Sequence, residues 1–105
     1  FHAAIAADGW LGIAMPEQYG GSGLGITEAA LMMETIAASG AGFSGASAVH
    51  MNIFGLHPVV VYASDEQKAR WLPPLIQGRD KACFGVTEPG AGLNTTRLTT
   101  KAVRD

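Results

Sequence analysis

Residues 83–96 read Cys-Phe-Gly-Val-Thr-Glu-Pro-Gly-Ala-Gly-Leu-Asn-Thr-Thr, an apolar run that passes into a polar turn punctuated by glycine. Phe84 and Val86 alternate as in a β-strand, and the proline that follows lacks a backbone donor and would stop strand pairing. Gly90 and Gly92 allow the main chain to approach a bulky group closely. The pattern indicates a strand whose end presents its backbone to a planar ligand, although an ordinary strand that ends in a turn has the same spacing.

Length and composition predict one modest, mainly helical domain. The chain has 105 residues, of which 48% are hydrophobic and 15% are charged. A composition this apolar in a short chain predicts an apolar surface that contacts another domain or subunit. The alternative explanation is an alanine-rich helical core. The net charge of −2 and the scattered basic residues argue against nucleic acid as a partner.

The cysteine and histidine content gives no metal site. Cys83 is the single cysteine, which excludes an internal disulfide and fits a reducing compartment. No base is placed to make it a nucleophile. His50 and His57 are seven positions apart with no third ligand nearby, so zinc binding is not expected. The sequence has no apolar run long enough to predict a membrane span.

Two apolar helices are predicted in the first half of the chain. Thr27 is a suitable N-cap with Glu28 in the first turn, and the apolar periodicity that follows stops at Ser39-Gly40. Met32 and Met33 on this helix are expected to fill the core. Residues 44–56 form the second apolar segment, after which His57-Pro58 predicts a kink or a new helix.

Helix boundaries are also predicted at the two ends of this region. Residues 1–10 have the spacing of a helix that breaks at Asp8-Gly9. Ser64 and Gln67 make a capping box, which predicts a helix start. Pro73-Pro74 is expected to end or bend that helix, and the following Gly-Arg-Asp should turn the chain into a β-segment.

The glycine-rich residues 15–25 do not form a dinucleotide-binding loop. A G-x-G-x-x-G pattern that starts at Gly21 requires glycine where Ile26 stands, and no strand precedes it. The same pattern from Gly90 fails at Thr95. An irregular loop is therefore predicted here.

The sequence resembles a known family over nearly its whole length. Residues 84–92, Phe-Gly-Val-Thr-Glu-Pro-Gly-Ala-Gly, closely resemble the flavin-binding signature of the acyl-CoA dehydrogenases. Stretches at 9–12, 15–25 and 65–73 precede this signature in the order and at the separations that the family uses. The resemblance implies a mainly α fragment of a longer protein: residues 1–79 would belong to its N-terminal helical domain. Residues 80–105 would run into the first strands of a β-barrel-like middle domain.

The resemblance implies an FAD-dependent dehydrogenase that oxidises an acyl-CoA thioester to the trans-2-enoyl-CoA by α-proton abstraction and β-hydride transfer. An electron-transfer flavoprotein would be the acceptor, and the complete protein would be a homotetramer, in the cytoplasm of a bacterium or in a mitochondrial matrix. The alternatives are an acyl-CoA oxidase, a related flavoprotein of the same superfamily, or a non-catalytic helical adaptor.

The same resemblance implies the site residues. The flavin would be bound by Phe84, Gly85, Val86, Thr87, Glu88, Pro89, Gly90, Ala91, Gly92 and Leu93. The acyl substrate would be bound by Leu93, His50, Met51 and Phe54, although a pocket lining and a helical core have the same composition. Phe54 on the pocket floor would favour a shorter acyl group.

No catalytic residue is expected in these 105 residues. In the family the base is a glutamate of the C-terminal domain, so neither Glu17 nor Glu88 takes that role, and Glu88 is expected to fix its turn. Many family members have serine and then aspartate where Leu93-Asn94 stands here. A side-chain hydroxyl contact at position 93 is therefore lost, while backbone contacts can remain.

Overall fold

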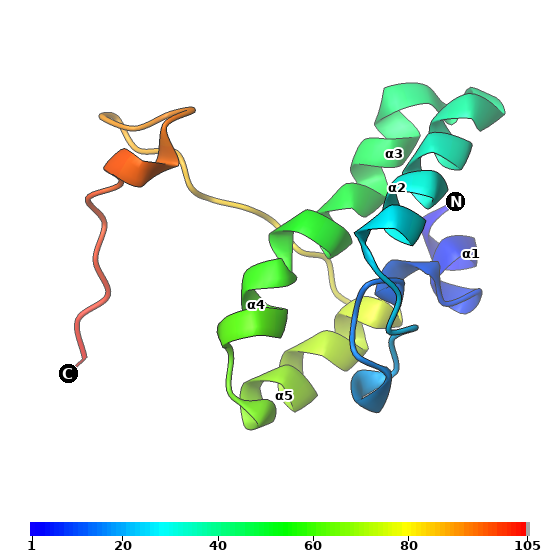
Figure 1. Ribbon diagram of the computed structural model, residues 1–105, viewed down its shortest axis with the longest axis horizontal. Coiled ribbons are helices and arrows are strands. Elements are labelled where there is room, and N and C mark those ends of the chain that lie inside the picture. Colours follow the sequence, from blue (N-terminus) through cyan, green and yellow to red (C-terminus); the bar gives the residue numbers. More distant parts are fainter. Residues whose placement is uncertain (105) are drawn as a thin grey trace.

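The computed structural model describes residues 1–104 and is mainly helical, as predicted (Figure 1). A helical unit spans residues 1–80, and the remaining chain leaves it as an extended segment, forms a small separate turn around residues 95–97 and continues beyond it without further helix or strand as far as residue 104 (Figure 1). The helices in the described residues are α1 (His2–Ala7), α2 (Ile26–Ile36), α3 (Gly42–His50), α4 (His57–Tyr62) and α5 (Asp65–Ile76), with short turns η1 (Trp10–Gly12), η2 (Glu17–Tyr19), η3 (Ala37–Ala41), η4 (Met51–Gly55) and η5 (Thr95–Arg97).

The segment between α1 and α2 is the buried centre of the helical unit. Leu11, Ile13 and Met15 alternate along it and are almost completely buried. Its backbone pairs with the chain that follows, since the N–H of Gly23 donates to the Met15 carbonyl oxygen at 2.8 Å and the N–H of Leu24 donates to Ile13 at 3.0 Å. An irregular loop was predicted for residues 15–25, and the burial of Leu11, Ile13 and Met15 at and before its start was not predicted, although their alternation is visible in the sequence.

Gly21 is required by the packing of this loop. A Cβ at position 21 would collide with the carbonyl group of Met15. Two backbone segments can therefore lie against each other here only if one of them carries no side chain. The glycine serves internal packing.

The start of α2 differs from the prediction. The helix begins at Ile26 rather than after Thr27, and Gly25 is its N-cap. The Glu28 carboxylate accepts a hydrogen bond from the Gly25 N–H at 2.9 Å, which satisfies a free donor at the helix start. Thr27 is thus inside the first turn. The predicted stop is confirmed, because Gly40 has a φ of 93° that breaks the helical path before α3.

The second apolar helix is confirmed and is longer than predicted. It starts at Gly42 as α3 and continues through the widened turn η4 to Gly55. The new helix expected at His57-Pro58 is α4, with the proline in its first turn, where the missing N–H costs no hydrogen bond.

The capping box of α5 is confirmed, but the two prolines do not end the helix. The Ser64 hydroxyl accepts from the Gln67 N–H at 3.2 Å, and the Gln67 side chain accepts from the Ser64 N–H at 2.9 Å. Pro73-Pro74 lies inside α5, where both carbonyl groups still accept hydrogen bonds from the residues that follow. Burial of Leu72 and Leu75 on either side of the prolines holds this part of the helix in place.

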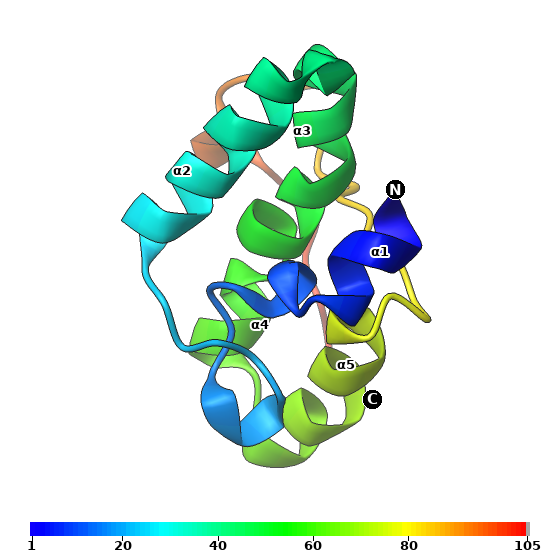
Figure 2. The ribbon, with the colours of Figure 1, turned by 90° about the vertical axis from the view of Figure 1, so that its right-hand side faces the viewer.

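Two apolar clusters form the core. Figure 2 shows α2 and α3 side by side, with α4 and α5 below them and the segment around η1 between the two pairs. The first cluster joins that segment to α2 and α3 and contains Leu11, Ile13, Ala29, Met32, Ile36 and Val49. The second joins it to α5 and to the residue between η4 and α4, and contains Met15, Leu56, Leu72, Leu75 and Ile76.

Residues 80–104 contain no strand in the structure. The expected alternation at Phe84 and Val86 lies in extended backbone, and the described residues offer this backbone no ladder partner. A single antiparallel bridge joins Glu88 to Ala91. A strand is defined by its partner, so the extended conformation agrees with the sequence pattern while the predicted run into β-strands is not shown.

Candidate functional site

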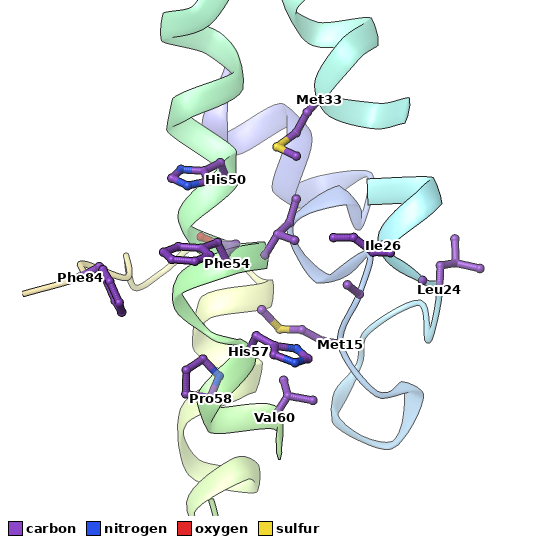
Figure 3. Close-up of a pocket in the computed structure, with 14 residues that line it drawn as sticks. Met15, Leu24, Ile26, Met33, His50, Phe54, His57, Pro58, Val60 and Phe84 are labelled. Atoms are coloured by element: carbon purple, nitrogen blue, oxygen red, sulfur yellow. The ribbon is translucent and has the colours of Figure 1, made fainter. Parts of the chain in front are cut away.

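An apolar cavity of about 610 Å³ opens beside η4. The loop before α2 forms one wall, and α3, η4 and α4 form the other (Figure 3). Its lining residues are Ala14, Met15, Leu24, Gly25, Ile26, Met33, His50, Asn52, Ile53, Phe54, His57, Pro58, Val60 and Phe84. A cavity of this size and polarity suits an apolar ligand, with a few polar groups at its edge to orient it.

Three aromatic rings meet at one side of this cavity. His50 and Phe54 stack with ring centroids 5.6 Å apart and an interplanar angle of 8°. Phe84 approaches Phe54 edge-on, with centroids 5.1 Å apart at 68° (Figure 3). Such geometries are favourable for aromatic pairs. The contact attaches the extended segment after α5 to the helical unit.

The structure brings some of the predicted site residues together and separates others. His50, Phe54 and Phe84 share the cavity wall, whereas Met51 is not among its lining residues and lies beside Gly55. Leu93 is fully exposed in the separate turn.

Several cavity residues were not predicted from the sequence. Met15 comes from the loop before α2 and Ile26 from the first position of α2, and Met33 was assigned to the core but also lines the cavity. Asn52 is buried and donates a hydrogen bond to the Leu75 carbonyl oxygen at 3.2 Å, which ties η4 to α5. The widened turn η4, a kind of turn that occurs often at functional sites, is apparent only in the structure.

The loop after Phe84 is shaped by one carboxylate. Glu88 Oε2 accepts from the N–H and the hydroxyl of Thr99, both at 2.9 Å, and Glu88 Oε1 accepts from the Thr100 N–H at 2.7 Å. The hydroxyl groups and backbone N–H groups of Thr100 and Thr99 beside the carboxylate lower the pKa of Glu88 from 4.5 to about 2. The carboxylate is therefore charged at any ordinary pH.

The glycines of this loop have no internal role. A Cβ at Gly85, Gly90 or Gly92 would meet no atom within 4 Å. None of the three has a left-handed backbone conformation either. Neither packing nor backbone strain in the described chain therefore requires glycine at these positions, in contrast to Gly21.

Two further kinds of site are not found in the described part of the chain. Within residues 1–104, no three of the His, Cys, Asp and Glu side chains gather closely enough to hold a metal ion. Of the helices described there, none has the length and apolar character needed to cross a membrane.

Comparison with known proteins gives a consistent family. A family model described as "Acyl-CoA dehydrogenase, N-terminal domain" matches residues 1–79. The acyl-CoA dehydrogenase FadE12 of Mycobacterium tuberculosis is 41% identical over 97 residues, which are 92% of this chain and 24% of that protein. A probable acyl-CoA dehydrogenase of Bacillus subtilis is 40% identical over 95 residues, 90% of this chain and 16% of that protein.

A third relative has a different name. The 3-(aryl)acrylate reductase of Clostridium sporogenes is 35% identical over 102 residues, which are 93% of this chain and 26% of that protein. The chain thus spans about a quarter or less of the length of these curated relatives. No solved structure gives a significant match to the chain.

Proposed function

The chain belongs to the acyl-CoA dehydrogenase family, and on this premise we propose that it is part of an FAD-dependent enzyme that oxidises an acyl-CoA thioester to the trans-2-enoyl-CoA. The observation that carries the proposal is the position of Phe84. This residue begins the signature-like stretch 84–92, and its ring also lines the apolar cavity against Phe54. A cofactor on the stretch and an acyl chain in the cavity would therefore be neighbours.

The residues after α5 fit a flavin. Among the described residues, no backbone N–H of 81–87 donates a hydrogen bond to another backbone group, so these donors are free for a ligand or for a partner strand. The open space at Gly85, Gly90 and Gly92 lets a planar ring system approach the main chain. A bound flavin supplies the hydride acceptor for the β-carbon.

The residues of this chain would bind and orient the acyl substrate, and they would not transfer protons. His50, Phe54 and Ile53 provide an apolar wall along which the acyl chain lies, away from water. Glu88 is unsuitable as the base, because a carboxylate with a pKa of about 2 has little tendency to accept a proton from carbon. We place the base outside these residues.

The domain assignment is part of the proposal. Residues 1–79 would form part of a helical domain and 80–105 the start of a β-domain, which is supported by the end of the family match at residue 79 and by the unpaired extended backbone after it. Phe43 and Tyr62 are 86% and 85% exposed, which supports contact with a further domain or subunit, as in a homotetramer.

A direct test is the visible spectrum of the complete polypeptide that carries this segment. We expect a bound-flavin spectrum that bleaches when an acyl-CoA thioester is added without oxygen. Reoxidation by an electron-transfer flavoprotein would identify a dehydrogenase, and rapid reoxidation by oxygen would identify an oxidase. A colourless protein that fails to take up added FAD would refute the proposal in favour of a helical adaptor.

The reductive direction is a second candidate. The name of the clostridial relative concerns an aryl acrylate, and three aromatic rings line the cavity here. Such a wall can pack against an aryl group. If an aryl acrylate, as the acid or its thioester, reoxidises the reduced protein faster than any aliphatic enoyl-CoA, this candidate is favoured.

A further inference from the structure

We propose that Glu88 is a positioning residue, whose carboxylate fixes the shape of loop 89–98 and so holds the backbone of Gly90 to Leu93 in place for the cofactor. The inference rests on the flavin-binding function proposed above. Glu88 itself acts through the loop and is not assigned a contact with the flavin or the substrate.

Both oxygen atoms of the carboxylate are engaged. Oε2 accepts two hydrogen bonds from Thr99 and Oε1 accepts one from Thr100, at 2.7 to 2.9 Å. The partners are 11 and 12 positions further along the chain, so the carboxylate closes the base of the loop. Hydrogen bonds to an ionised acceptor are short and about twice as strong as neutral ones.

The loop is also held inside this closure. The N–H of Glu88 donates to the Ala91 carbonyl oxygen at 3.0 Å, and the N–H of Ala91 donates back at 3.1 Å. Asn94 Oδ1 accepts from the backbone N–H of Thr96 at 3.3 Å and also from its hydroxyl. These local bonds set the turn at each side, and Glu88 is the group that joins the two ends.

Among the side-chain hydrogen bonds described in residues 1–104, only those of Glu88 connect the two ends of this loop. The turn around η5 lies apart from the helices (Figure 1), so helix packing does not hold it. The glycines inside the loop leave its backbone flexible unless the ends are fixed. The three hydrogen bonds of this carboxylate therefore help to order the loop before a ligand arrives, which lowers the entropic cost of binding.

The test uses Glu88→Gln in the complete polypeptide. The amide keeps the shape of the side chain but replaces one acceptor with an NH2 group, which would face an N–H donor of Thr99 or Thr100. Glu34→Gln is the matched control. Glu34 is exposed on α2, so this substitution makes the same chemical change outside the loop.

The first measurement is trypsin cleavage of the protein without FAD. Arg97 lies inside the closed loop and Lys101 just beyond it, whereas Lys81 lies outside and serves as the internal reference. We expect Glu88→Gln to speed cleavage after Arg97 and Lys101 by about tenfold relative to Lys81, since local opening sets the rate. Equal rates in both variants would overturn the closure of the loop by Glu88.

The second measurement is the affinity for added FAD and the activity at saturation. We expect Glu88→Gln to raise the Kd for FAD by about tenfold, because the loop is less ordered in this variant and must be ordered when FAD binds. At saturating FAD, the flavin spectrum and kcat should return to those of the Glu34→Gln control. Faster cleavage with an unchanged Kd would overturn the positioning role, and kcat that stays low at saturation would show that Glu88 takes part in turnover itself.

The two proposals fail in different ways. If the unmodified protein takes up no FAD, the proposed function is refuted and the positioning role with it, while the cleavage pattern still reports the loop closure. If the unmodified protein binds FAD and Glu88→Gln binds it equally well, only the positioning role is refuted.

Discussion

Replacing Phe54 with alanine is the most informative perturbation of the cavity. Phe54 is 53% exposed and stands between His50 and Phe84, so its ring limits the cavity at one side. Alanine removes the whole ring and leaves the backbone of η4 unchanged. If the acyl chain lies along this wall, the space of the ring becomes available to additional methylene groups.

The expected size of the effect follows from apolar burial. Each methylene that enters the enlarged cavity gains about 0.8 kcal/mol, a factor of about four in binding. Two additional methylene groups would therefore raise kcat/KM for the longer substrate by about fifteenfold relative to the shorter one. The cost to folding is moderate, about 1–2 kcal/mol, because the ring is half exposed in the native state.

The assay is kcat/KM for acyl-CoA thioesters of increasing chain length, measured with the complete, flavin-loaded protein. We expect the optimum to move to longer chains in Phe54→Ala. Trp71→Ala is the control, since Trp71 is 41% exposed on α5 and does not line the cavity. An unchanged chain-length profile in Phe54→Ala, with a normal flavin spectrum, would refute the assignment of this wall to the acyl chain.

Three further predictions concern groups whose surroundings the structure defines. The pKa of Glu88 is lowered from 4.5 to about 2, so the loop closure should be complete above pH 4.5 and lost as the pH falls through about 2; a carboxyl NMR titration with its midpoint near 4.5 would contradict this. Gly21→Ala should lower the free energy of unfolding by at least about 2 kcal/mol through its collision with Met15, while Gly90→Ala should change it by less than about 0.5 kcal/mol; denaturant unfolding compares them. Asn52→Ala should cost about 1–2 kcal/mol in thermal unfolding, because a buried hydrogen bond to α5 is lost, and an unchanged Tm would refute that role.

Local patterns predicted the helical part of the fold well. The capping box at Ser64 depends on two side chains three residues apart, and the stop at Gly40 depends on one backbone angle, so both are determined within a few residues. The N-cap at Thr27 was predicted wrongly because Glu28 can serve an earlier residue equally well. Pro73-Pro74 does not end α5, which continues to Ile76 with Leu72 and Leu75 buried on either side of the prolines.

The candidate site was predictable only in part. The resemblance indicated His50, Phe54 and Phe84, and the structure brings these three to one wall. The opposite wall, with Met15 and Ile26, depends on a loop that folds back over helices far along the chain. The sequence shows the alternation of Leu11, Ile13 and Met15 but not the helices against which these residues pack, so their burial was not predicted.

The two glycine-rich loops show why glycine spacing alone does not identify a ligand site. In the first, Gly21 is required because the backbone at Met15 occupies the place of its Cβ. In the second, Gly90 and Gly92 have open space around them and ordinary backbone angles, so the described chain itself gives no reason for glycine. For the second loop, close approach of an external group is a physical reason for glycine. The first loop does not need this explanation, because its own backbone requires Gly21. The support for a cofactor at residues 84–93 therefore comes from the resemblance together with this difference, which only the coordinates reveal.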